Sequence, residues 1–163
     1  MGDYNAKIHL INLYHGPFAL KRNPEKAIEI LEDLEINFEK NSNEENNKSY
    51  YSKVAIYTRL GDIYHSEKNF VKALENFKKA INEIPPSAHA YYVLGRMTEK
   101  GEGVEKNRLK AVKYFYKAAD LKHEWAFKRL SVLYKFGWGV EKNIEKSNEF
   151  LNKYELLGQR KDK

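Results

Sequence analysis

An eight-residue segment recurs along the chain almost unchanged and at a fixed distance. Residues 100–107 read KGEGVEKN, and residues 136–143, thirty-six positions later, read FGWGVEKN. The similarity extends beyond this segment, for example at Leu94 and Leu130. Self-similarity at such a period is typical of repeat proteins, in which each unit packs against its neighbours. The chain is therefore expected to fold as an array of similar units, an architecture that usually binds a partner rather than catalysing a reaction.

The unit that precedes these two copies shows how one repeat is built. Small residues recur where two helices would cross closely, and large apolar residues recur where the space between them must be filled. A proline follows the second predicted helix and is expected to stop it. These positions have the spacing of a tetratricopeptide repeat, and they are Tyr57, Leu60, Gly61, Tyr64, Ala73, Phe77, Ala80 and Pro85.

The two later units are longer than this one by four residues. Leu94 precedes Ala111 by 17 positions, whereas Leu60 precedes Ala73 by 13. The additional residues form a loop whose two glycines supply positive-φ turns at low steric cost. The units therefore resemble Sel1-like repeats, the tetratricopeptide-like subfamily with an extended inter-helix loop. The resemblance rests on Ala90, Leu94, Gly95, Gly101, Gly103, Val104, Lys110, Ala111, Tyr114, Lys117, Ala118 and Ala119.

The resemblance implies an all-α fold, a right-handed α-solenoid of about four antiparallel helix pairs. We expect one helical-repeat domain over residues 1–163, with no break that suggests a second domain. Its units are predicted at roughly 4–40, 50–86, 88–121 and 124–157.

The ends of the units carry further local signals. In the first unit, Leu10 matches the leucine position of the repeat, and Asn23 is predicted to cap a helix that starts at Pro24. Residues 41–48 are polar and rich in asparagine, so a flexible connection is expected there. Gly158 is predicted to terminate the last helix.

Composition limits the environment of the chain. There is no cysteine, which excludes disulfide bonds and thiolate metal sites and fits a reducing compartment. No apolar run approaches the roughly 18 residues that a membrane span requires. Residues 1–7 lack the basic start and apolar stretch of a signal peptide. A soluble, cytoplasmic protein without membrane contact is expected from these features.

The net charge of +6 lies entirely in the second half of the chain. Residues 1–82 contain twelve basic and twelve acidic residues, whereas residues 83–163 contain seventeen basic and eleven acidic ones. Solvated helix faces with a basic tail are the simpler explanation. The alternative is attraction to an acidic partner.

Motifs of enzyme active sites are mostly absent. The glycine-bearing loop at residues 101–106 has no Gly-Lys-Ser/Thr ending and follows a predicted helix, so a phosphate-binding loop is not indicated. The chain contains neither a His-Glu-x-x-His sequence nor a Gly-x-Ser-x-Gly elbow. We therefore predict no enzyme, no catalytic residue, no cofactor and no metal site.

The resemblance also indicates which residues face a partner. In tetratricopeptide-like solenoids, a fixed set of first-helix positions lines the concave groove. In the first unit these positions are Asn5, Ile8, Asn12 and His15. In the later units they are Ala55, Thr58, Asp62 and His65; His89, Tyr92, Arg96 and Glu99; and Trp125, Lys128, Val132 and Lys135.

Histidines and tryptophans on this surface have more than one interpretation. His15, His65 and His89 lie on the groove positions, whereas His9 and His123 lie off them. Ordinary hydrogen bonding explains these histidines most simply, a recognition groove comes next, and a metal site is least favoured because the ligands would have to converge from different units.

The two tryptophans pose a similar choice between recognition and packing. Trp125 either contacts a partner or fills the seam between helices. Trp138 replaces Glu102 of the other copy, so the repeat itself does not require an indole there. It is predicted as a loop contact for the partner, and the alternative is that it folds back onto Phe136.

The groove residues also bear on the class of partner. Tetratricopeptide proteins that clamp a C-terminal carboxylate use Lys and Asn at the positions held here by Thr58 and Asp62, so such a clamp is not expected. A partner with a basic or polar element near Asp62 and an acidic element near Arg96, Lys128 and Lys135 fits better.

Nucleic acid is a less favoured partner. Lys110, Lys113 and Lys117 lie along one helical stripe, but two of them match the scaffold pattern of the family, and the chain is only moderately basic.

The resemblance implies scaffolds and adaptors in bacterial signalling, secretion and envelope complexes. Small proteins of this kind also resemble immunity proteins that neutralise a cognate toxin. We predict a protein–protein interaction module that acts as an adaptor or scaffold through the concave groove. An immunity protein is the main alternative.

Overall fold

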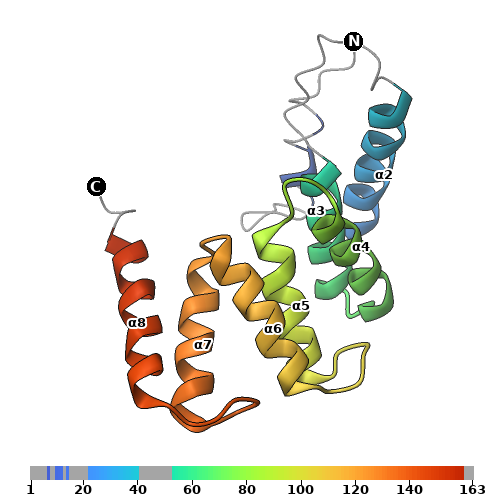
Figure 1. Cartoon of the computed structure of the whole chain (residues 1–163). Coiled ribbons are helices and arrows are strands. Elements are labelled where there is room, and N and C mark those ends of the chain that lie inside the picture. Colours follow the sequence, from blue (N-terminus) through green and yellow to red (C-terminus); the bar gives the residue numbers. More distant parts are fainter. Residues whose placement is uncertain (1–6, 8–9, 13, 15–21, 41–52, 160–163) are drawn as a thin grey trace. The chain divides into compact units, whose positions relative to one another are not determined.

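The computed structural model describes residues 7, 10–12, 14, 22–40 and 53–159, and helices are the only regular elements in these ranges (Figure 1). The chain divides into two compact units, Met1–Glu83 and Ile84–Lys163. The predicted connection at residues 41–48 and the predicted groove positions Asn5, Ile8 and His15 lie outside the described residues. The helices are α2 (Pro24–Lys40), α3 (Lys53–Ser66), α4 (Phe70–Asn82), α5 (Ala88–Lys100), α6 (Arg108–Asp120), α7 (Glu124–Phe136) and α8 (Ile144–Gln159).

The first unit is built around α3, which packs against both α2 and α4. The predicted start of α2 is confirmed, because Pro24 is its first residue and the Asn23 side-chain oxygen accepts a hydrogen bond from the Lys26 backbone N–H at 3.0 Å. The predicted close crossing of α3 and α4 is also confirmed. A Cβ atom on Gly61 would lie 2.6 Å from the ring of Phe77, which is fully buried. The two helices can pack this closely only because residue 61 has no side chain.

At the beginning of the chain, the burial expected for Leu10 is wrong. Leu10 was expected at the buried leucine position of the repeat, but its side chain is 38% exposed, whereas that of Ile11 is 1% exposed. Both residues are apolar, so the sequence pattern alone does not distinguish them. Burial on one helix face decides between them, and it selects Ile11.

The second unit repeats the same construction twice. Helix α5 pairs with α6, helix α7 pairs with α8, and α6 also packs against α7 (Figure 1). Gly95 is equivalent to Gly61, because a Cβ atom there would lie 2.6 Å from the buried ring of Phe115. The second helix of each pair starts with an asparagine cap. Asn107 accepts from the Lys110 N–H at 2.8 Å, and Asn143 accepts from the Lys146 N–H at 2.9 Å.

The glycine loops have the predicted backbone conformation. Gly101 and Gly103 have φ values of 83° and 71°, and Gly137 and Gly139 have values of 72° and 76°. Gly101 and Gly137 are the left-handed residues that end α5 and α7. The repeated octapeptide is therefore a helix stop followed by a turn into the next helix.

The predicted end of the last helix is wrong. Gly158 was expected to terminate it, but α8 continues through Gly158 to Gln159. No atom lies within 4 Å of the position that a Cβ would take at this glycine, so no neighbouring element forces the chain to turn there. A helical glycine costs only about 1 kcal/mol relative to alanine, which a helix of this length tolerates.

Candidate functional site

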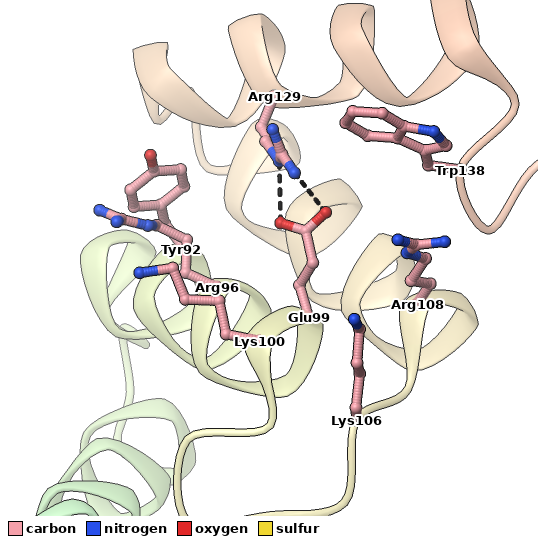
Figure 2. Close-up of a pocket in the computed structure, with 8 residues that line it drawn as sticks. All are labelled: Tyr92, Arg96, Glu99, Lys100, Lys106, Arg108, Arg129 and Trp138. Atoms are coloured by element: carbon pink, nitrogen blue, oxygen red, sulfur yellow. Dashed lines mark hydrogen bonds and ion pairs between the residues drawn. The ribbon is translucent and has the colours of Figure 1, made fainter.

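A pocket of about 550 Å³ opens in the second unit, beside the first glycine loop. Figure 2 shows its lining, to which α5, the loop after α5, the start of α6, α7 and the loop after α7 all contribute. Three of the predicted partner-binding residues of the groove, together with the predicted loop contact Trp138, meet here. The complete lining is Tyr92, Arg96, Glu99, Lys100, Lys106, Arg108, Arg129 and Trp138.

One ion pair crosses this pocket and connects α5 to α7. The Nε of Arg129 donates to one carboxylate oxygen of Glu99 at 2.9 Å, and the Nη2 donates to the other oxygen (Figure 2). The Glu99 side chain is 11% exposed, and the Arg129 side chain is 29% exposed. This two-point geometry fixes both side chains, so Glu99 acts within the pocket as the counter-ion of Arg129.

Replacement of Glu99 with glutamine is expected to lower the free energy of unfolding by about 1–3 kcal/mol, because the Arg129 guanidinium then loses its charged acceptor in a partly buried place. Urea denaturation followed by circular dichroism measures this loss. The control is Glu105→Gln, which removes the same charge at an exposed position of the adjacent loop. Equal stability of the two variants would show that the ion pair contributes nothing to the fold.

Trp138 combines the two interpretations that the sequence left open. Its indole stacks on Phe136, with ring centroids 5.0 Å apart and planes inclined by 24°. It also lies against two cations, since the guanidinium carbons of Arg108 and Arg129 are 5.7 Å and 5.9 Å from its ring centre. Trp138 therefore does fold back onto Phe136, and in that position it forms a wall of the pocket.

The loop that carries Trp138 is held against the start of α6. A Cβ atom on Gly139 would lie 2.9 Å from the backbone carbon, the carbonyl oxygen and the Cβ of Arg108. Only glycine permits this approach at a φ of 76°. The contact sets Trp138 beside Arg108, although the two residues belong to successive repeats.

The pocket is strongly cationic. Five of its eight lining residues carry a positive charge and Glu99 alone carries a negative one. The Lys100 Nζ lies 3.2 Å from the Glu102 Oε1, and Glu99 is already paired with Arg129. The lining therefore keeps an excess of positive charge that attracts anions.

A second cluster of predicted groove residues lies on α7. The indole of Trp125 is 48% exposed, and the ammonium of Lys128 lies 5.1 Å from its ring centre. The same ammonium lies 5.1 Å from the ring centre of Tyr154 in α8, which is itself in contact with Trp125. Lys135 is exposed and lies 5.7 Å from the ring centre of Phe136, and it does not line the pocket.

His123 was predicted to lie away from the groove residues, but the structure brings it against two of them. Its ring stacks on Tyr92 with centroids 4.6 Å apart and lies 5.8 Å from the ring of His89. His123 is the residue directly before α7, a position that helix-face arguments do not cover. Within the described ranges, His, Cys, Asp and Glu side chains form no group of three that could hold a metal ion.

The remaining predicted residues, Thr58, Asp62 and His65, lie on α3 in the first unit. All three are partly buried. The Thr58 hydroxyl donates to the Val54 carbonyl at 2.6 Å, and the His65 ring packs against Phe70 with centroids 5.5 Å apart.

Sequence reasoning missed half of the pocket lining, namely Lys100, Lys106, Arg108 and Arg129. The prediction considered a fixed set of first-helix positions, and none of these residues occupies one. A comparison between the two copies provides a signal. Arg108 corresponds to Ile144 and Lys100 corresponds to Phe136, so the cations stand where the other copy has apolar residues.

A partly buried tyrosine of α6 and a buried tyrosine of α7 connect these two helices. The hydroxyls of Tyr116 and Tyr134 are 2.6 Å apart. Burial raises the pKa of Tyr116 above its ordinary value, and the hydrogen bond to Tyr134 raises it further. The Tyr116 hydroxyl therefore stays protonated at neutral pH, and its hydrogen bond to Tyr134 connects α6 to α7.

Comparison with known proteins identifies the family of this fold. Antiparallel helix pairs joined by glycine loops define a helical-repeat protein. Sel1 repeats match residues 12–32, 53–83, 88–123 and 128–153, which is more than half of the chain. The chain belongs to the Sel1 repeat family, as its resemblance predicted. Sel1 repeat proteins are generally protein-interaction modules and typically non-catalytic scaffolds. No curated protein matches the chain.

Two solved structures have a similar fold. One is a protective antigen present in uropathogenic Escherichia coli strains that displays an SLR fold, with 20% identity and a TM-score of 0.72 over 96% of this chain. The other is a Sel1 repeat protein from Oxalobacter formigenes, with 18% identity and a TM-score of 0.70 over 95% of this chain. The alignments cover 31% and 57% of those two proteins, respectively. The predicted class, an all-α solenoid, is confirmed. No helix in the described part of the chain is long and apolar enough to cross a membrane.

Proposed function

We propose that this chain is a protein-recognition module that binds a partner protein through first-helix side chains of its repeats and acts as an adaptor. The observation that carries the proposal is a cluster formed by the exposed Trp125 and Lys128 of α7 and the partly exposed Tyr154 of α8. Tryptophan and tyrosine are among the usual anchors of protein interfaces, and Lys128 adds a positive charge beside them.

The position of Trp125 supports the same function. Nearly half of its side chain is exposed, at 48%. It also lines a smaller pocket of about 310 Å³, together with Leu121 and Leu157. A partner that covers this region would bury the rest of the indole and these leucines, which is favourable because apolar area leaves water. Thr58, Asp62 and His65 on α3 are proposed as further contacts.

Trp125→Ala and Lys128→Glu are each expected to lower the affinity for the purified partner by about tenfold or more. The first removes an aromatic side chain that the partner would bury, and the second reverses a charge at the interface. The partner would be trapped with a photo-crosslinking residue at position 125, identified by mass spectrometry, purified, and titrated by calorimetry. The control is Lys113→Glu, which makes the same charge change at an exposed position of α6. Circular dichroism checks that each variant folds.

Unchanged affinity in both Trp125→Ala and Lys128→Glu would overturn the proposal. The identity of the trapped protein separates an adaptor from an immunity protein. A toxin whose killing activity is suppressed when this chain is co-expressed would indicate immunity, whereas a signalling or secretion component would indicate an adaptor.

A further inference from the structure

The pocket contains more positive charge than the repeat fold requires. The equivalent positions in the other copy make this clear, because Arg96, Lys100 and Arg108 correspond to Val132, Phe136 and Ile144. Arg129 corresponds in the preceding copy to Val93. Apolar residues therefore satisfy the same scaffold at these four positions, and the repeat fold by itself does not require a cation at any of them.

Lys106 is the exception among the five cations of the pocket, because the other copy has the same residue type at the equivalent position. Its counterpart is Lys142. The Cβ atoms of the two lysines lie 3.3 Å and 3.4 Å from the positions that a Cβ would take at Gly101 and Gly137. This recurrence of sequence and contact indicates a structural role for Lys106 within the loop. The comparison thus separates one lysine of the scaffold from four cations that are particular to this pocket.

The aromatic walls of the pocket are already engaged by neighbouring groups. Trp138 has Phe136 stacked on it and two guanidiniums near its ring, as described above. Tyr92 has His123 stacked at 4.6 Å and the Arg96 guanidinium carbon at 6.0 Å from its ring centre. A nucleotide base would need an aromatic face on which to stack. The N–H donors of the cations are what the pocket offers to a ligand, and these select an anion.

The placement of the cations favours several separated anionic groups over a single one. Arg96 and Lys100 come from α5, Arg108 comes from the start of α6, and Arg129 comes from α7 (Figure 2). A single phosphate is much smaller than a space of about 550 Å³ and would reach only part of this lining. Carboxylates on neighbouring side chains of an extended peptide can approach cations on several walls.

We infer that this pocket binds a protein segment with two or more acidic side chains, and that Arg96, Lys100 and Arg108 are its specificity-determining cations. The inference rests on the proposed function, because it describes how the partner is recognised. The ion pair with Glu99 fixes the Arg129 guanidinium in position before the ligand binds.

The probe is a fluorescein-labelled extended peptide that contains four glutamates, measured by fluorescence anisotropy against the full chain. Binding is expected, with an affinity that falls as salt rises, because the contacts are between charges. The same peptide with glutamine in place of glutamate is expected to bind at least tenfold more weakly. The double variant Arg96→Glu, Arg108→Glu is expected to lose at least tenfold in affinity for the acidic peptide.

The matched control is the double variant Lys110→Glu, Lys113→Glu, which changes the net charge by the same amount at exposed positions of α6 outside the pocket lining. Its affinity is expected to stay within about threefold of the unchanged chain. Equal losses in the two double variants would overturn the inference, since they would show attraction to the overall charge. Failure of the acidic peptide to bind would also overturn it.

Two further competitors separate the ligand classes. A peptide with a single phosphoserine, or a single-stranded oligonucleotide, that displaces the acidic peptide at tenfold lower concentration would overturn the inference in favour of a phosphate site. The outcome also remains separate from the proposed function. If Lys128→Glu abolishes binding of the purified partner but the Arg96→Glu, Arg108→Glu double variant binds it with unchanged affinity, the pocket inference is wrong and the proposed function stands. If the peptide binds in the pocket while Trp125→Ala and Lys128→Glu leave the affinity for the partner unchanged, the proposed function is wrong instead.

Discussion

Replacement of Phe115 with alanine is expected to lower the free energy of unfolding by about 3–5 kcal/mol. The Phe115 side chain is 0% exposed, and its ring lies between the backbone of α5 at Gly95 and the ring of Tyr92, whose centroid is 5.9 Å away. Removal of the ring leaves a cavity in the core between α5 and α6. The loss therefore includes both the buried apolar surface and the cavity.

Urea denaturation monitored by circular dichroism at 222 nm measures this effect. Phe136→Ala is the control, since Phe136 is an exposed phenylalanine of the same unit. It is expected to change the stability much less, although it also removes the stacking partner of Trp138. A loss below about 1 kcal/mol for Phe115→Ala would mean that this ring is not part of the packed core.

Gly95→Ala is expected to destabilise the chain by about 1–3 kcal/mol, although alanine is the better helix former. The new Cβ would lie 2.6 Å and 2.8 Å from two atoms of the Phe115 ring, so the ring or the helix has to shift. The buried ring has no open space to move into. Thermal or urea unfolding measures the loss.

The sign of this effect is expected to reverse once the ring is removed. In a Phe115→Ala background, Gly95→Ala should stabilise the chain by up to about 1 kcal/mol, because only the helix propensity remains. Gly158→Ala is a second control, since no atom lies within 4 Å of its Cβ position and the residue is helical. It should also stabilise slightly. A destabilising Gly95→Ala in both backgrounds would show that the clash with Phe115 is not the cause.

Much of this fold could be predicted from the sequence because its constraints are local and are repeated. Gly61 and Gly95 mark close helix crossings, and Gly101 and Gly137 mark helix ends, since each position admits no other residue easily. The same argument failed at Gly158, where nothing in the surroundings requires a turn. It also failed at Leu10, because two adjacent apolar residues satisfy the pattern equally and only burial distinguishes them.

The candidate site was predictable only in part. The repeat register put Tyr92, Arg96 and Glu99 on one helix face, because such positions follow from helical geometry, and all three line the pocket. It did not predict that Glu99 would pair with Arg129, thirty positions later in the sequence. Long side chains such as arginine reach across to neighbouring helices, so their partners depend on tertiary packing. Lys106 lies in the loop and Arg108 begins the second helix, so neither occupies one of the first-helix positions that the prediction considered.

The tight approach of Gly139 to Arg108 has a consequence for how such proteins can be re-engineered. Gly139 packs the loop of one repeat against the start of the second helix of the previous repeat. The pocket is therefore lined by residues of two successive repeats. A graft of one repeat into another solenoid would transfer Arg108 without Trp138, or Trp138 and Arg129 without Arg108. The smallest segment of this chain that would transfer the complete pocket is therefore the adjacent pair of repeats from α5 to α8, with both glycine loops retained.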